Sequence, residues 1–333
     1  MRPPTPKPLG TDAASLFIWD NHVCPPMDVH ALPAQLPKLE RLHAAGVRVV
    51  SLNVGYGEMA LKEHLDVLFA VRSWLSDRPD QFQIVSKTAD IDDAVKSGRL
   101  AVTFDVEGVA PLAEADDALD RFYELGVRWM LLAYNRNNWA ASGIHDQDRG
   151  LTAKGRSLIA RMQRSGMVVC LSHTSEQTCW DALDAAEGPV VFSHSNPFSL
   201  EPHPRNISDE LIKGCAETGG VIGINGLELF IGKGRTNAAG FADHLTYIAD
   251  LVGPQHCALG TDYVFDLDGL NQEKASMADS FPAGCGYEED TVCTEPEFLH
   301  QLPDELTRRG WSQEDIASAL GGNWLRIAST CWR

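Results

Sequence analysis

The sequence predicts a (β/α)8 barrel of the TIM type, an α/β fold in which parallel strands alternate with helices. Short runs rich in β-branched residues recur along the 333 residues, and they are apolar almost throughout, as in strands buried on both faces. Amphipathic stretches such as 32–46, 113–126 and 175–188 lie between the runs and end at Gly, a residue that stops helices. Strand–helix alternation repeated this often is typical of a parallel barrel.

Eight runs are the expected strands of this barrel. They cover 15–22, 47–54, 99–108, 127–135, 167–173, 189–195, 220–226 and 256–263. A weaker ninth candidate covers 82–87. The rival architecture, a doubly wound open sheet, is disfavoured because no GxGxxG motif follows the first run. We expect one barrel domain over 1–333, with a long acidic loop at about 266–295 that acts as a lid or as the contact of a homodimer.

Composition excludes some classes of partner. The formal net charge is −18, from 46 acidic and 28 basic residues, whereas nucleic-acid and anionic-membrane binding both need clustered basic charge. The N-terminal segment MRPPTPKPLGTD lacks the apolar core of a signal peptide, and no apolar stretch approaches the ~20 residues needed to cross a bilayer. We therefore expect a cytoplasmic protein with a small-molecule substrate, and no nucleic-acid or membrane partner.

The chain has eight cysteines and no CxxC spacing. In a reducing compartment most of them should be free thiols, and Cys170 and Cys257 lie inside apolar runs where a thiol packs like a small hydrophobic group. Cys285 and Cys293 flank a polar loop, which leaves a local disulfide between them as an alternative.

Polar residues fall at the ends of the expected strands. In a (β/α) barrel these ends meet at one mouth, where active sites lie. A single strand-end histidine is usually structural, but a set at successive strand ends is harder to explain that way. Three imidazoles and two carboxylates in the set suit Zn²⁺ or a similar divalent ion. The set consists of His22, Glu107, Tyr134, His173, His194 and Asp262.

These residues, in this order, resemble the membrane (renal) dipeptidase family of zinc metallopeptidases, which is related to the amidohydrolase barrels. The spacing agrees with the family, with 21 residues from His173 to His194 (194 − 173) and 11 from His194 to Arg205. The similarity covers nearly the whole chain. The motifs that carry it are DNH at 20–22, FDVEG at 104–108, LLAYNRNN at 131–138, GLTAKGRSLI at 150–159, VVCLSH, VVFSHSNPFSLEPHPRN, HLTYIADLVGPQHCALGTD and GGNWLRIAS.

The resemblance implies a metallo-dipeptidase that cleaves an amide bond with a metal-bound hydroxide as nucleophile. Glu107 would bridge two Zn²⁺ ions, with His173 and His194 on one ion. His22 and Asp262 would hold the other ion, and Asp262 would also transfer the proton from the water to the leaving amine. Arg205 would grip the carboxylate of the substrate, for which a planar guanidinium is suited.

Two positions depart from the family pattern. Cys24 stands two residues after His22, where the family normally has Asp. Its thiolate is a competent zinc ligand, so it either replaces the Asp or merely fills space beside a single occupied metal site. Tyr134 stands where the family commonly has a His that steadies the oxyanion. A phenol also donates to an oxyanion and contacts substrate, or it forms only a wall of the pocket.

These departures leave two further hypotheses open. One is an amidohydrolase that acts on an N-acyl or modified amino acid, because Arg205 still provides a carboxylate grip. The other is a barrel that has lost a metal and its activity and only binds a ligand. Two further histidines, His145 and His203, fall in strand-end loops near the expected mouth, and the sequence assigns them no role.

Overall fold

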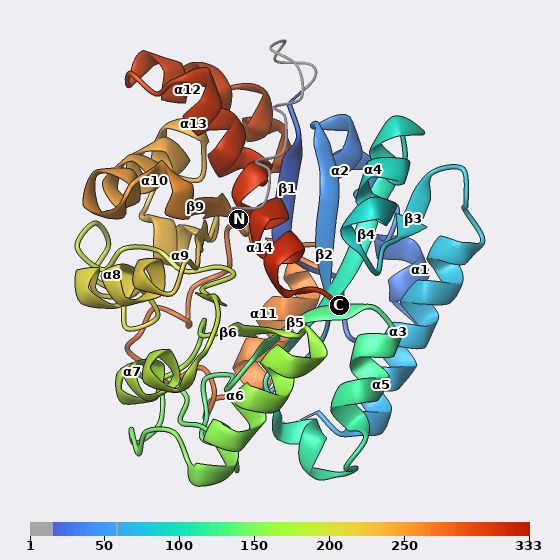
Figure 1. Ribbon diagram of the computed structural model, residues 1–333, viewed down its shortest axis with the longest axis vertical. Coiled ribbons are helices and arrows are strands. Elements are labelled where there is room, and N and C mark those ends of the chain that lie inside the picture. The colour runs from blue at the N-terminus through green and yellow to red at the C-terminus, as the bar shows by residue number, and fades with distance from the viewer. Residues whose placement is uncertain (1–15, 58) are drawn as a thin grey trace, which may run out of the picture.

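The computed structural model describes residues 16–57 and 59–333, and it is built on a parallel sheet that curls into a barrel (Figure 1). The Pro-rich N-terminal segment and the first residue of the first expected strand lie outside the described residues. The strands are β1 (Ile18–Cys24), β2 (Val47–Tyr56), β3 (Phe82–Ile84), β4 (Leu100–Glu107), β5 (Val127–Leu131), β6 (Val168–Cys170), β7 (Val190–Val191), β8 (Ile222–Ile224), β9 (Cys257–Leu259) and β10 (Tyr263–Val264).

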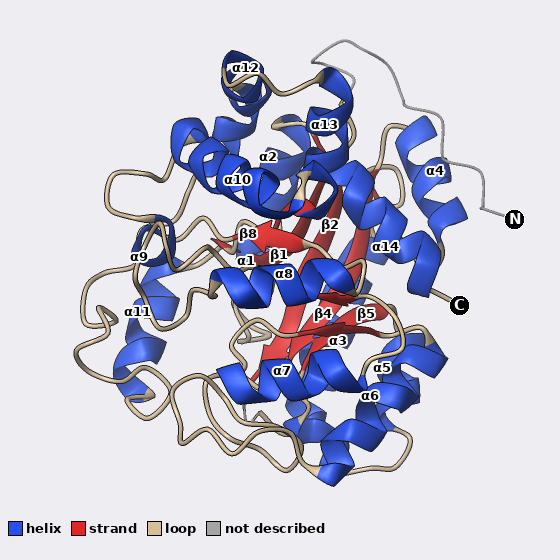
Figure 2. Cartoon of the chain, turned by 60° about the vertical axis from the view of Figure 1, so that its left-hand side comes forward, coloured by secondary structure: helices blue, strands red, loops and turns tan. Residues whose placement is uncertain are grey.

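Every strand pair is parallel, and the strand order is β7-β6-β5-β4-β2-β1-β9-β8. A parallel bridge between Phe192 and Ile222 then joins the β7 end of the sheet to β8 and brings its two edges together. The predicted (β/α)8 barrel is therefore confirmed. Its eight strands are the eight expected runs, which are buried on both faces because helices surround the sheet (Figure 2).

Several strands, such as β5 and β7, are shorter than the predicted runs, and three further differences concern the topology and the site. β1 extends two residues further, to Cys24. The run at 256–263 breaks into β9 and β10, which both pair with β1. The weak ninth candidate forms β3, which pairs with the first residues of β4, whereas β5 pairs with the last ones. β3 therefore flanks β4 without adding a strand to the closed order.

Helices cover the outside of the barrel, and long ones such as those over Leu61–Ser76, Ala153–Ser165 and Ala238–Val252 bury apolar side chains in the core. In the helix over Ala153–Ser165, the Thr152 hydroxyl accepts a hydrogen bond from the Gly155 amide, and Gly166 ends the helix with φ of 92°, a conformation that favours glycine. The α-helices are α1 (Leu32–Gln35), α2 (Lys38–Ala44), α3 (Leu61–Ser76), α4 (Thr88–Lys96), α5 (Ala118–Glu124), α6 (Ala153–Ser165), α7 (Glu176–Ala185), α8 (Asp209–Glu217), α9 (Glu228–Ile231), α10 (Ala238–Val252), α11 (Leu267–Ser276), α12 (Leu302–Arg308), α13 (Gln313–Ala317) and α14 (Asn323–Cys331).

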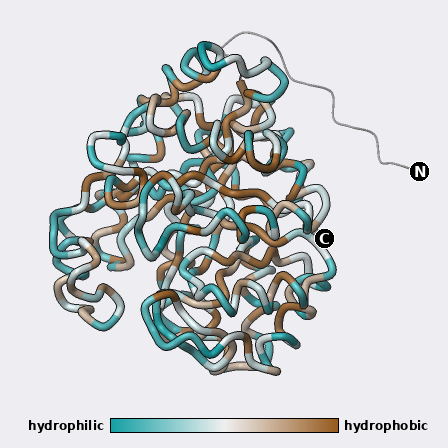
Figure 3. The backbone as a smooth tube through the Cα atoms, turned by 90° about the vertical axis from the view of Figure 1, so that its left-hand side faces the viewer, coloured by the Kyte–Doolittle hydropathy of each residue, from teal (hydrophilic) through white to brown (hydrophobic). Residues whose placement is uncertain are grey.

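The apolar core has two parts. In Figure 3 the segments of hydrophobic residues, coloured brown, run through the centre of the molecule. The larger part fills the space between strands and helices. The smaller part fills the N-terminal end of the barrel, where Trp19 and Trp129 from β1 and β5 meet Trp324 from α14, and Trp332 just after it. Because α14 closes this end, the opposite end, where the strands finish, is the open one.

The segment 266–295, which we call the lid, is not a plain loop. Its first part forms α11, capped by Asp266, whose carboxylate accepts a hydrogen bond from the Gly269 amide. The alternative of a local disulfide is wrong, because Cys285 and Cys293 are both free thiols. In the described part of the chain, no helix is long and apolar enough to cross a membrane.

Candidate metal centre

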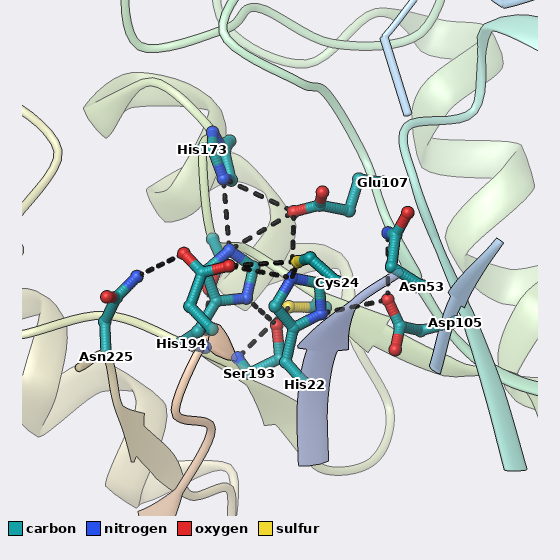
Figure 4. Close-up of polar contacts among 12 residues, drawn as sticks. His22, Cys24, Asn53, Asp105, Glu107, His173, Ser193, His194 and Asn225 are labelled. Atoms are coloured by element: carbon teal, nitrogen blue, oxygen red, sulfur yellow. Dashed lines mark hydrogen bonds and ion pairs between the residues drawn. The ribbon is translucent and has the colours of Figure 1, made fainter. Parts of the chain in front are cut away.

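The six ligand-type residues expected from the sequence converge at the open end of the barrel. Figure 4 labels five of them, His22, Cys24, Glu107, His173 and His194. β1 ends with His22 and Cys24, and β4 ends with Glu107. Asp262 lies in the break between β9 and β10. His173 and His194 follow β6 and β7 by three residues each, so every side chain enters the mouth from a strand end or the loop after it.

Glu107 is at the centre of the cluster. Its Oε1 atom lies 3.3 Å from His173 Nε2, 3.2 Å from His194 Nε2 and 3.6 Å from His22 Nε2. The Nε2 atoms of His173 and His194 are 3.1 Å apart. Two ligands on one tetrahedral Zn²⁺, each about 2.0–2.1 Å away, are about 3.3–3.4 Å apart. These three side chains therefore have the separations that a shared ion requires.

A second group forms on the β1 side of Glu107. The Cys24 Sγ atom lies 3.4 Å from His22 Nε2 and 3.0 Å from Asp262 Oδ1. His22 Nε2 and Asp262 Oδ1 are 3.6 Å apart, and the remaining oxygen of Asp262 accepts a hydrogen bond from Asn225. The Cys24 side chain thus points into the cluster and is placed as a ligand would be.

Each histidine of the cluster is oriented by a hydrogen bond at its other ring nitrogen. His22 Nδ1 lies 3.0 Å from an Asp105 oxygen, His173 Nδ1 lies 2.7 Å from Asn135 Oδ1, and His194 Nδ1 lies 2.8 Å from the Ser193 hydroxyl. With Nδ1 engaged, the Nε2 atoms are the ones that face the cluster. This is the arrangement that metal-ligating histidines have in proteins.

Sequence reasoning missed these three partners. Asp105 had a signal, because it stands two residues before Glu107 on β4 and so faces the same side of the strand. It also accepts hydrogen bonds from Ser51 and Asn53, so it is held from three directions. Asn135 and Ser193 had no comparable signal, since neutral polar residues are common at strand ends.

The backbone at the mouth is strained. Among the described residues, those other than glycine with positive φ are Asn135 (54°), His173 (64°) and Asp262 (56°), and all three belong to the cluster or its hydrogen-bond partners. Such conformations persist where the surrounding structure fixes them, and they are concentrated at functional sites. Gly260 allows a close approach here as well, because a Cβ atom there would collide with the Ser193 carbonyl.

The electrostatics of the cluster suit a cation. Glu107 is 5% exposed, its Oε1 atom has no hydrogen-bond partner, and burial raises its pKa to about 8. Burial lowers the pKa of His173 and of His194, which favours the neutral imidazoles that ligate metals. At His22 burial also acts to lower the pKa, but the neighbouring acidic groups of Cys24, Asp105 and Glu107 together outweigh it and raise the pKa. The donor set and its orphaned oxygen therefore fit divalent ions.

The two residues expected to contact substrate lie in different surroundings. Tyr134 lines the cleft in front of the cluster and stacks on His173, with ring centroids 4.4 Å apart. Arg205 is only 3% exposed and is not among the residues that line this cleft. Its Nη atoms donate to Ser195 Oγ and to the His194 carbonyl, and its Nε atom has no partner.

The cleft over the cluster has a volume of about 740 Å³, within the range of small-molecule sites. The floor includes Cys24, Glu107, His173 and Asp262, and the lid supplies much of one wall. A compound of dipeptide size fits such a volume.

Comparison with known proteins agrees with this geometry. A family model described as membrane dipeptidase, peptidase family M19, matches residues 54–331. The chain belongs to this family. The match begins after β1, so His22 and Cys24 precede it.

Curated relatives of this chain are named as dipeptidases. An uncharacterized dipeptidase of Schizosaccharomyces pombe is 34% identical over 248 residues, which are 71% of this chain and 55% of the relative. Dipeptidase ataJ of Aspergillus terreus is 30% identical over 292 residues, 80% of this chain and 66% of the relative. The chain thus spans little more than half of the first relative and about two thirds of the second.

Solved structures share the fold. An amidohydrolase from Pseudomonas aeruginosa superposes with a TM-score of 0.85 at 24% identity, over 96% of this chain and 98% of that chain. A metallopeptidase from Rhodobacter sphaeroides, liganded with a phosphinate mimic of L-Ala-D-Ala, gives 0.77 at 19% identity, over 95% and 99% of the chains. At these identities the likeness supports the barrel architecture.

Proposed function

We propose that the protein is a metal-dependent dipeptidase that hydrolyses the amide bond of a dipeptide at the open end of its barrel. One observation carries the proposal. The unpartnered Oε1 atom of Glu107 lies within 3.2–3.6 Å of three imidazole Nε2 atoms, which belong to the two groups of ligand-type side chains. Family membership and the phosphinate dipeptide mimic bound by the Rhodobacter sphaeroides protein support this substrate class.

The ligand set supports two Zn²⁺ ions. His173 and His194 would hold one ion, and His22, Cys24 and Asp262 the other. The carboxylate of Glu107 would serve both. When bound, the ions would lower the pKa of a water and polarise the amide carbonyl.

The remaining steps fall to side chains of this chain. The Asp262 carboxylate, which Asn225 orients by a hydrogen bond, would accept the proton of the attacking water and return it to the leaving amine. The Tyr134 hydroxyl would donate to the oxyanion, because burial raises the pKa of this phenol and keeps it protonated. Arg205 would bind the carboxylate of the substrate through its free N–H groups.

Metal analysis tests the centre. Purified protein reconstituted with Zn²⁺ should hold two ions per chain, measured by inductively coupled plasma mass spectrometry. A chelator should abolish hydrolysis, and added Zn²⁺ should restore it. One ion per chain with full activity would remove the Cys24 group from the catalytic site.

A substrate screen tests the reaction. Dipeptides, N-acyl amino acids and dipeptide amides would be offered to the Zn²⁺-loaded protein. Hydrolysis of dipeptides supports the proposal, whereas cleavage of N-acyl amino acids alone would assign the chain to the amidohydrolase alternative. If the protein binds these compounds but hydrolyses none of them, the hypothesis of a barrel that only binds a ligand would be supported. The expected cytoplasmic location, the single-domain organisation and the homodimer stay predictions of the sequence.

A further inference from the structure

The lid contributes two aromatic side chains to the cleft, Phe281 and Tyr287, and Tyr287 is the more deeply buried of the two. Tyr287 lies in an irregular part of the lid, yet it is only 8% exposed, and it lines the cleft together with Phe281 and Phe230. Irregular surface segments rarely bury so large a side chain without a role in packing or binding.

Tyr287 is fixed at both its ring and its hydroxyl. The ring packs edge-on against Phe281, His203 and Phe230, with centroids 5.3, 5.6 and 6.4 Å away. The hydroxyl lies 2.7 Å from Nε2 of His145, which comes from the loop between β5 and α6. A phenol held in this way keeps one orientation toward the cleft.

Tyr287 and the buried side chain of Arg205 contact the same neighbouring residues, Phe230 and His203. The Arg205 guanidinium lies over Phe230, 5.8 Å from the ring centroid, and the Arg205 amide donates to His203 Nδ1 at 3.0 Å. Arg205 has an unpartnered Nε and no carboxylate partner among the ion pairs of the described residues. A guanidinium with free N–H groups beside a neutral phenol is suited to an anionic oxygen.

We propose that Tyr287 binds the carboxylate end of the substrate together with Arg205, and that His145 is the positioning residue that aims the Tyr287 hydroxyl. The inference rests on the proposed dipeptidase function. It gives the two histidines that the sequence left unassigned a place beside this subsite, with His203 as packing between Tyr287 and Arg205.

The protonation states agree with these roles. Burial lowers the pKa of His145 to about 4, so its imidazole is neutral at physiological pH. Burial raises the pKa of Tyr287, which therefore remains a phenol. With the proton of His145 on Nε2, the imidazole donates to the phenol oxygen, and the hydroxyl hydrogen of Tyr287 is free to donate to a carboxylate.

The test compares a dipeptide with its C-terminal amide, which lacks the carboxylate. Tyr287→Phe keeps the ring packing and removes the hydroxyl. For the dipeptide, KM should rise about tenfold, the effect of one hydrogen bond to a charged group, while kcat changes by less than about twofold. For the amide, KM should stay unchanged. Tyr247→Phe is the matched control, because its hydroxyl donates to Asp209 on the outer helices.

His145→Gln tests the positioning role. It should raise the KM of the dipeptide by a smaller factor, and combining it with Tyr287→Phe should add nothing further, because the imidazole acts through the phenol. Equal changes for dipeptide and amide, or no change in Tyr287→Phe, would overturn the inference.

Calorimetric binding separates this inference from the proposed reaction. If the wild type binds the dipeptide more tightly than the amide and Tyr287→Phe removes that difference, the subsite stands even where no hydrolysis occurs. If the wild type shows no such difference, or the variant keeps it, the inference fails although dipeptides are hydrolysed. Unchanged zinc content in both variants shows that the metal centre is intact.

Discussion

The two groups of ligand-type side chains are held in different ways. His173 and His194 follow two neighbouring strands, and neutral groups, an Asn135 amide and a Ser193 hydroxyl, orient their rings. On the other side, His22 shares the strand β1 with Cys24, and a carboxylate, Asp105, orients its ring. The first group lies within the family match at 54–331, and the β1 residues precede it.

This difference concerns the charge that surrounds each of the two expected ions. The β1 side holds two carboxylates besides Glu107, namely Asp262 in the cluster and Asp105 behind His22, and this negative charge favours a dication there. On the other side, the groups that orient His173 and His194 are neutral, so Glu107 is the carboxylate that would balance the charge of that ion. Glu107 is therefore the residue that both groups share, whereas Cys24 belongs to the β1-side group alone.

Glu107→Gln should have the largest effect, because the amide removes the one carboxylate common to both groups. We expect loss of both ions and a fall in kcat/KM of at least about 10³-fold, corresponding to several kcal/mol of lost stabilisation. Metal analysis and dipeptide kinetics measure this. A variant that keeps one ion at full occupancy would mean that the groups bind independently.

Cys24→Ala should remove the β1-side ion alone and lower hydrolysis about 10²-fold, as the loss of one metal function would. Cys24→Asp should keep both ions and hydrolyse plain dipeptides at least as well as the wild type. Cys331→Ala, on the helix α14 at the opposite end of the barrel, is the control and should change neither. Equal zinc content in the wild type and Cys24→Ala would show that the thiol is only filler.

Metal removal gives an independent check on Cys24. A thiolate that holds a metal ion is not free to act as a nucleophile, so Cys24 should resist alkylation in the Zn²⁺-loaded protein and react once a chelator is added. Peptide mass mapping identifies the alkylated position. Ready alkylation of Cys24 in the fully loaded protein would contradict its role as a ligand.

The orienting partners should show the smallest effects, and unequal ones. Asp105→Asn should weaken binding of the β1-side ion about 10- to 100-fold, because the carboxylate raises the basicity of His22. Ser193→Ala removes a neutral hydrogen bond worth about 1 kcal/mol and should weaken the other ion only about fivefold. Competition with a chromophoric chelator measures both affinities. Equal losses would remove the contrast between the two sides.

Much of the site could be predicted because it follows from local pattern. Continuous apolar runs predict strands buried on both faces, and a parallel barrel brings the ends of such strands to one mouth whatever the loops do. His22, Glu107 and His194 therefore needed no structure to be grouped. Their grouping as ligands was a prediction, and the distances of 3.2–3.6 Å that join them agree with it.

What only the tertiary structure decided are contacts between side chains distant in sequence. Asp105 meets His22 across 83 residues, and Tyr287 meets His145 across 142, through the path of the lid. Arg205 is buried over the ring of Phe230 and donates to Ser195 and the His194 carbonyl, contacts that no spacing along the chain could indicate. Strand periodicity fixes the face on which a side chain lies, but rotamers and loop paths, set by packing of the whole fold, fix which atoms it touches.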